Sequence, residues 1–123
     1  MLKLIMCVKR QPRLTRGEFD EHWRNRHAPL VREHAALLGI RKYVQTTPLA
    51  NPAAQSALQR ARGTESVDFD GCAELWWDDL DSHLAARASP EGRQALKDLI
   101  EDEQRFVDLT RSQLWYGMEH EVI

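Results

Sequence analysis

Apolar residues alternate or cluster in four stretches of the chain, and they recur at helical spacing in two longer ones. The expected strands span residues 2–9, 40–47, 70–78 and 113–122. They carry the β-branched, aromatic and alternating positions typical of strands. The order of these elements predicts an α+β fold of ferredoxin-like βαββαβ topology, with a four-stranded antiparallel sheet and helices on one face.

The first long helix is expected to begin after Thr15, because Thr15 and Glu18 have the spacing of a capping box. At about 100° per residue, one stripe of about 80° is predicted to face the core. Its members are Phe19, Trp23, His27, Leu30, His34 and Leu37. Pro29 has no amide for the Asn25 carbonyl, which predicts a kink or a local loosening just after His27.

A short helix from Asp79 or Asp81 to Arg87 and a longer one from Ser89 to about Phe106 are predicted to follow the third strand. The inner and flanking positions of the longer helix are Leu96, Leu99, Ile100 and Glu103.

Residues 50–67 interrupt this pattern between the second and third strands. They are polar and alanine-rich, with Asn51 and Pro52 suited to open a short helix and Gly63 suited to end it. We interpret them as a mobile, partly helical insertion within a single domain of residues 1–123. A lid over a cavity and a surface insertion without a role are both open.

The sheet face that the helices leave bare is expected to be apolar. Trp76, Tyr43 and the first strand are predicted to need cover there, and a second copy of the chain would supply it. A homodimer, sheet against sheet, is therefore expected.

The charge and composition of the chain limit the classes of partner that it is expected to bind. The chain has 17 basic and 19 acidic residues and a formal net charge of −2, so nothing indicates nucleic acid. We expect no membrane association and a cytoplasmic location, because the sequence has no apolar run of about 20 residues and no signal-peptide pattern. Cys7 and Cys72 are predicted to be free thiols outside any metal-binding pattern.

His27 is the first catalytic candidate, because imidazole exchanges protons near neutral pH. It would act as a general acid or base in a cavity between the first helix and the sheet, or else would only hydrogen-bond the backbone beside Pro29. His22, a substrate-binding candidate, lies about 140° around the helix from His27, which places the two rings on different faces. His83 and His120 are expected at the surface.

Glu74 and Tyr43 are the other catalytic candidates. A buried Glu74 needs a partner or a raised pKa, so it would either polarise a substrate or pair structurally with Arg41. Tyr43 would donate to a developing oxyanion or serve as an aromatic wall. Trp23 and Trp76 are expected to bind the substrate, because the aromatic residues of the chain fit a pocket for a flat apolar or aromatic molecule. Arg41 is the remaining substrate-binding candidate.

No nucleotide, metal or nucleophile-elbow motif is present, which leaves a cofactor-free mechanism as the expectation.

Four motifs in order resemble the EthD family of the dimeric α+β-barrel superfamily. The first is Phe-x-x-His-Trp-x-x-x-His-Ala-Pro-Leu at residues 19–30. The others are residues 41–45, 70–77 and 89–92. The resemblance implies two sheets closing into a barrel, a cavity in each protomer, and oxidoreductase or monooxygenase-type chemistry.

Two other functions fit the same residues. Proton transfer, as in dehydration or cyclisation, needs fewer assumptions than oxygenation. A noncatalytic protein that binds a small molecule for a separate oxidase is the alternative from a different class.

Overall fold

A computed structural model describes residues 1–123 and contains the predicted elements in the predicted order. They are β1 (Leu2–Val8), α1 (Arg16–His22), a π-helical turn η1 (Trp23–His27), α2 (Ala28–Leu38), β2 (Lys42–Thr46), α3 (Pro52–Arg62), β3 (Gly71–Trp77), α4 (Leu80–Ala88), α5 (Pro90–Phe106), a 3₁₀ turn η2 (Leu109–Arg111) and β4 (Gln113–Met118).

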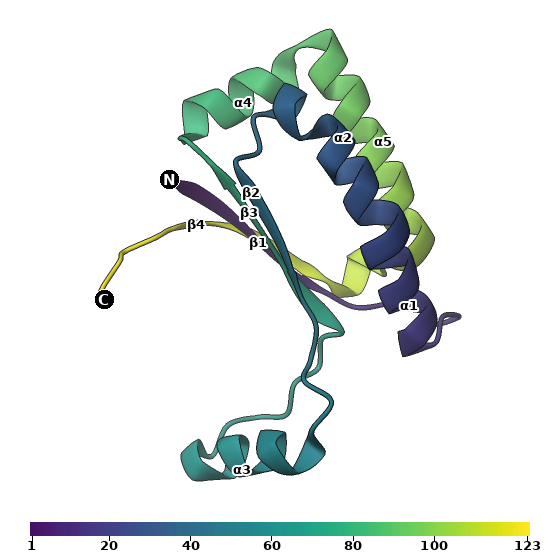
Figure 1. Ribbon diagram of the computed structural model, residues 1–123, viewed down its shortest axis with the longest axis vertical. Coiled ribbons are helices and arrows are strands. Elements are labelled where there is room, and N and C mark those ends of the chain that lie inside the picture. Colours follow the sequence, from purple (N-terminus) through teal and green to yellow (C-terminus); the bar gives the residue numbers. More distant parts are fainter.

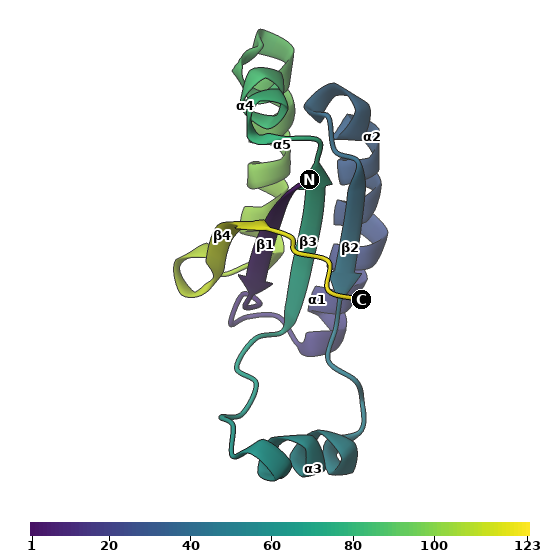
Figure 2. The ribbon, with the colours of Figure 1, turned by 90° about the vertical axis from the view of Figure 1, so that its left-hand side faces the viewer.

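The four strands form one antiparallel sheet in the order β2-β3-β1-β4. All helices except α3 lie over one face of this sheet, and the other face is bare (Figures 1 and 2). The predicted α+β, ferredoxin-like βαββαβ architecture is therefore confirmed.

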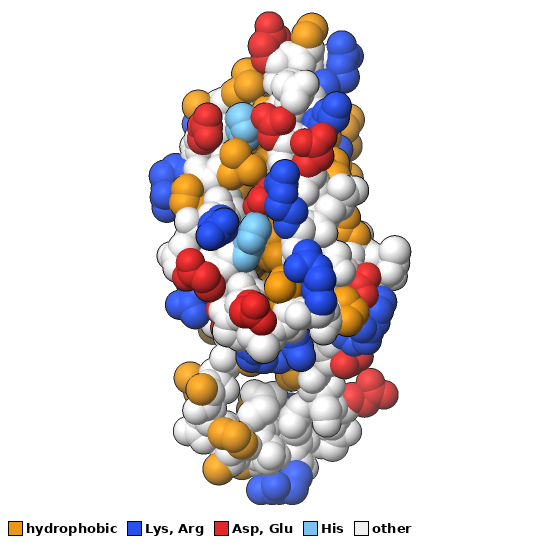
Figure 3. Space-filling view, turned by 90° about the vertical axis from the view of Figure 1, so that its right-hand side faces the viewer, with side chains coloured by type: hydrophobic (Ala, Val, Ile, Leu, Met, Phe, Trp, Pro, Cys, Tyr) orange, Lys and Arg blue, Asp and Glu red, His pale blue; other side chains and the backbone are white.

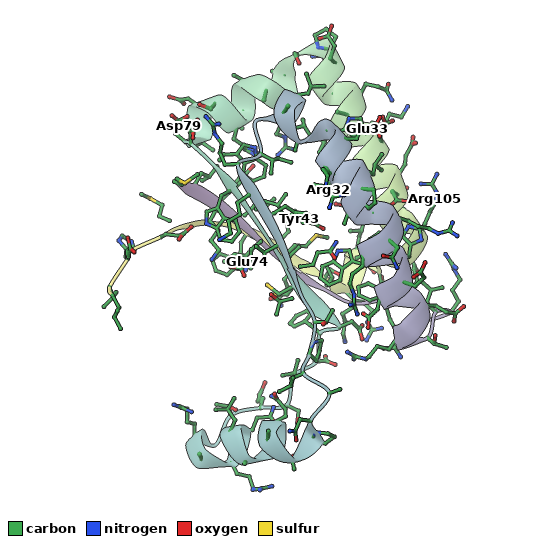
Figure 4. The ribbon with its side chains drawn as sticks, viewed as in Figure 1. Arg32, Glu33, Tyr43, Glu74, Asp79 and Arg105 are labelled. Atoms are coloured by element: carbon green, nitrogen blue, oxygen red, sulfur yellow. The ribbon has the colours of Figure 1, made fainter.

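The register of the strands decides which side chains face the helices. Tyr43 lies opposite Leu75, while Val44 lies opposite Glu74. Because side chains alternate along a strand, Tyr43 points toward the helices and Glu74 toward the bare face (Figure 4). The prediction that Tyr43 lies with Trp76 on the bare face was wrong. Alternation within one strand does not show which set faces the helices.

The start of α1 is the predicted capping box. The Glu18 amide donates to Thr15 Oγ1, and the Thr15 amide donates to Glu18 Oε1. Farther along, the helix loosens before Pro29 into the π-helical turn, where the Ala28 amide donates to the Trp23 carbonyl.

This wider turn moves the inward stripe of α2 by one residue. Val31 and Leu38 are 2% and 4% exposed, whereas the predicted Leu37 is 46% exposed. The upstream part of the stripe was correct, because Phe19, Trp23 and His27 are all buried.

The core fills the space between the helices and the sheet. Its larger cluster joins β1, α1, β3 and the end of α5 around Phe19, Trp23 and Phe106. A second cluster joins α2 to α5 through Val31, Leu38, Ala95 and Leu99. Gly71 begins β3 directly under the Trp23 ring, where an added Cβ would lie 2.6 Å from Cζ3. A glycine is needed there for close approach.

The insertion forms helix α3, as predicted. Asn51 caps its start, and Gly63, with φ of 67°, ends it. The helix projects from the ends of β2 and β3 away from the rest of the molecule and buries none of its residues (Figure 1).

Side chains of both charge signs are mixed over the outer face of the helical layer (Figure 3). No helix has the length and apolar character required to cross a membrane. The last strand is shorter than predicted, ending at Met118, and the C-terminal residues extend beyond it on the bare side of the sheet (Figure 1).

Candidate active site

A cavity of about 300 Å³ lies between the helical layer and the sheet. Its wall is mostly apolar, with Trp23 packed tightly into it from η1. Five titratable groups are exceptions: His27, Tyr43, His83, Arg87 and Glu103. A mostly apolar cavity with a few convergent polar groups is the usual form of a small-molecule site.

The π-helical turn brings His22 and His27 onto one carboxylate. His27 Nδ1 lies 2.8 Å from Asp102 Oδ2, and His22 Nε2 lies 3.0 Å from Asp102 Oδ1. The prediction that the two rings lie on different faces was wrong, because it assumed regular α-helical geometry. Backbone bonding from residue i to i+5 places residues five apart on the same side, and such turns are frequent at functional sites.

Asp102 selects the tautomer of His27, and burial keeps the ring neutral. Burial lowers the pKa of His27 below 6.5, although the hydrogen bond and charge of Asp102 act in the other direction. Burial acts to raise the pKa of Asp102, but the bonds with His27 and His22 outweigh it, so the pKa lies below 3.8. At neutral pH an ionised Asp102 accepts a hydrogen bond from the Nδ1–H of a neutral His27.

His27 lines the cavity, and its Nε2 is then unprotonated. This nitrogen makes no hydrogen bond within the protein, and it is not among the buried side-chain atoms without a partner. It therefore reaches open space. A neutral imidazole oriented by a carboxylate, with its second nitrogen free, is the arrangement of a general base.

Tyr43 is held in the same cavity by Gln45. Gln45 Nε2 donates to Tyr43 Oη at 3.0 Å and to the Trp23 carbonyl at 2.9 Å, which ties β2 to the π-helical turn. Burial raises the pKa of Tyr43 above 10, so its hydroxyl stays protonated. Because Gln45 donates to this oxygen, the Tyr43 hydrogen is available to a ligand.

Glu103 is an acidic residue of the same cavity wall. Burial, and next the charge of Asp102, raise the pKa of Glu103 to about 7. Its carboxyl lines the cavity and makes no hydrogen bond to another side chain. Near neutral pH it is partly protonated, in the same cavity as the free nitrogen of His27. Environments that move two such groups in opposite directions are typical of acid–base pairs.

Besides His22, which contacts Asp102 but does not line the cavity, three predicted site residues lie outside it. Glu74 pairs with Lys3 on the bare face and not with Arg41 (Figure 4). Arg41 instead forms a two-pronged pair with Asp78 at the surface. Trp76 lies on the bare face between two cations, with the Lys3 and Lys42 ammonium groups 4.9 and 4.8 Å from its ring centroid. The proposed association of these residues with His27 is not found.

Three site residues escaped the sequence analysis. Asp102 was assigned no role, and Glu103 was noted only as an inner or flanking position. Asp102 lies three residues and Glu103 four residues after Leu99, and Phe106 follows one turn later. Both therefore lie on the stripe that faces the core. His83 was expected at the surface but is 2% exposed. No group of three or more His, Cys, Asp or Glu side chains is arranged to hold a metal ion.

Comparisons with known proteins agree with this fold. The model of the EthD domain matches residues 11–110. An EthD family protein from Bacillus halodurans is 30% identical, with 98% of this chain and 99% of that chain covered and a TM-score of 0.63. The decarboxylase dmxR15 of Cryptosporiopsis sp. is 25% identical over 121 residues, which cover 98% of this chain and 81% of that protein.

Two other structures share the fold at lower identity. A variant of SnoaB, a cofactor-independent oxygenase from Streptomyces nogalater, is 12% identical with a TM-score of 0.57 over 99% of this chain and 95% of that one. A dimeric protein with ferredoxin-like fold from Bacteroides fragilis is 16% identical with a TM-score of 0.58, over 96% and 95%. Proteins of this fold thus include enzymes of small-molecule chemistry. With the family match over most of the chain, this protein belongs to the EthD family.

Proposed function

We propose that this protein is an acid–base enzyme that moves a proton to or from carbon in an apolar or aromatic small molecule. The observation that carries the proposal is the free His27 Nε2 and the protonatable Glu103 carboxyl in one apolar cavity of about 300 Å³. The named decarboxylase among the similar proteins also supports chemistry at carbon.

Each group has a distinct role in this proposal. His27 Nε2 takes a proton from the substrate, and Asp102 stabilises the imidazolium that forms. Glu103 gives a proton to the leaving group or to the carbanion, and Tyr43 donates a hydrogen bond to the developing oxyanion. Dehydration and cyclisation use both the base and the acid. Decarboxylation uses the oxyanion donor and the acid, because the carbanion left when carbon dioxide departs must be protonated. None of these proton transfers needs a cofactor.

The test uses nitrobenzisoxazole, an apolar aromatic probe whose ring opens when a base removes its carbon-bound proton. The wild type should open it with saturable kinetics, at a rate above that of free imidazole at the same concentration. His27→Gln should lower kcat about 100-fold or more with KM nearly unchanged, because proton transfer by a positioned base contributes a factor of about 10² to 10⁴.

His34→Gln is the matched control, because His34 pairs with Asp98 away from the cavity and should leave the rate unchanged. A rate no greater than that of imidazole, or one insensitive to His27→Gln, would contradict the proposal. Saturable binding of the probe without any ring opening would instead favour a noncatalytic binding or accessory protein.

Cofactor-independent oxygenation is the second candidate. It is favoured by the structural likeness to SnoaB, a named cofactor-independent oxygenase. Dioxygen uptake during turnover of an aromatic substrate would support this reaction over proton transfer alone. Turnover at an equal rate without dioxygen would exclude it.

We also infer that the protein acts as a homodimer whose sheets face each other. Trp115 pairs with Ile5 of β1, as Glu74 does from the other side, so its ring lies on the bare face, where it is 51% exposed. Trp76 lies on the same face. A second copy would bury much of this apolar surface. The dimeric relative from Bacteroides fragilis supports this assembly.

A further inference from the structure

His83, Arg87 and Tyr116 form a second polar cluster, which we name the rim triad. His83 Nε2 lies 2.9 Å from the Tyr116 hydroxyl and 3.1 Å from Arg87 Nη1, and Arg87 Nη1 lies 3.3 Å from the same hydroxyl. His83 and Arg87 both line the cavity that contains His27. The half-exposed Tyr116 lies beside them on β4.

The rim triad and His27 lie toward opposite ends of the cavity. The Trp77 ring, at the end of β3, contacts the His83 ring with centroids 4.2 Å apart. Gly71, at the start of β3, lies under Trp23 of the π-helical turn. A seven-residue strand spans about 20 Å. A ligand that reaches both ends must therefore be elongated.

The protons of the rim triad are fixed by Arg87. A guanidinium only donates, so the bond with His83 requires a lone pair on Nε2 and places the ring hydrogen on Nδ1. Burial and the charge of Arg87 lower the pKa of His83, which keeps the ring neutral. His83 is 2% exposed, and its Nδ1 is buried without a hydrogen-bond partner. A buried donor left unpaired is a stability cost that calls for a reason.

Arg87 is the one permanently charged side chain in the cavity wall. Its contacts are to two uncharged groups, and both use Nη1. The hydrogens on Nη2 and Nε remain for a ligand, in the fork geometry that matches a carboxylate. With Glu103 protonated, the cavity wall carries a net positive charge at this end, which an anionic ligand complements.

We propose that the rim triad binds a carboxylate of the substrate, so that the substrate is an elongated apolar carboxylic acid. Arg87 holds the carboxylate through Nη2 and Nε, His83 and Tyr116 position its guanidinium by accepting from Nη1, and the apolar body extends toward His27. This carboxylate anchors the molecule and is not the group that reacts, because it lies at the far end from the base. The inference rests on the proposed function only in placing the substrate in this cavity.

The experiment compares acids with their uncharged amides by isothermal titration calorimetry. The probes are naphthoate and naphthamide, and anthracene carboxylate and anthracene carboxamide. The wild type should bind the acid at least tenfold more tightly than the amide of the same ring system, because the acid gains charge-assisted bonds with Arg87.

Variants locate the preference. Arg87→Met should bring acid and amide to nearly equal affinity while amide binding stays within about twofold, and Arg87→Lys should retain part of the preference because it keeps the charge. Arg24→Met is the matched control. It removes one positive charge from an exposed position on η1 that does not line the cavity, and it should leave the preference unchanged.

Two results would overturn the inference alone: equal binding of acid and amide by the wild type, or equal weakening of both in Arg87→Met, which would indicate only a packing role. Failure of all four probes to bind would contradict the cavity as a ligand site, and with it both the proposed function and this inference.

Discussion

The raised pKa of Glu103 predicts a stability that falls as the pH rises. Its carboxyl has a pKa of about 7 in the folded protein against 4.5 in the unfolded chain. The corresponding stability is fully present below pH 4.5 and is lost as the pH rises through about 7, because the unfolded chain then loses its proton more readily than the folded protein. Each tenfold change in proton affinity corresponds to about 1.4 kcal/mol, so the total loss is about 3 kcal/mol.

Glu103→Gln removes this titration while it keeps the shape of the side chain. We expect the free energy of unfolding of the wild type to fall relative to Glu103→Gln by about 2 to 3 kcal/mol between pH 5 and pH 8. The opposite contribution of His27, whose lowered pKa adds stability as the pH rises toward 6.5, is common to both proteins and cancels in the difference.

Urea denaturation at fixed protein concentration measures this difference. Glu101→Gln is the matched control, because Glu101 lies on the exposed side of the same helix, 3.9 Å from Lys97. Its pH profile should run parallel to that of the wild type. Parallel profiles for Glu103→Gln and the wild type would refute the reasoning, since they would show that Glu103 titrates alike in the folded and unfolded states.

Three further outcomes are expected. Gly71→Ala should destabilise the protein by about 1 to 3 kcal/mol in urea denaturation, because the new methyl group collides with the Trp23 ring. Gly17→Ala, at an exposed helical position, should instead stabilise the protein by up to about 1 kcal/mol. Equal effects of the two substitutions would contradict the packing of Gly71 against Trp23. Asp102→Asn should lower the pKa of His27 further in an NMR titration, because Asp102 is the group that raises it, and an unchanged or higher value would argue against the pair. Sedimentation at micromolar concentration should give twice the chain mass of 14.2 kDa, and a species of 14.2 kDa alone would contradict the dimer.

The sequence was sufficient for features set by local patterns. The capping box at Thr15, the strands and the helix in the insertion follow from residues close together in the chain. The EthD motifs pointed to the helix that carries His27, and the structure places His27 in the cavity wall. Which sheet face carries the cavity depends on how Tyr43 pairs with Leu75 on another strand, and alternation within a strand cannot supply that.

The π-helical turn and Asp102 show a second limit. Pro29 indicated a local disturbance, but widening and kinking are both answers to its missing amide, and only the first brings His22 and His27 together. Asp102 and Glu103 sit within an acidic run and were not given roles. Their helical phase relative to Leu99 and Phe106 was the available signal that they face inward.

The most direct test of the acid–base site is the protonation state of His27 in the wild-type protein. Long-range ¹⁵N–¹H NMR at pH 7 should show a neutral ring with its hydrogen on Nδ1, leaving Nε2 free as the base in the cavity. An imidazolium, or a neutral ring with the hydrogen on Nε2, would contradict the role assigned to His27.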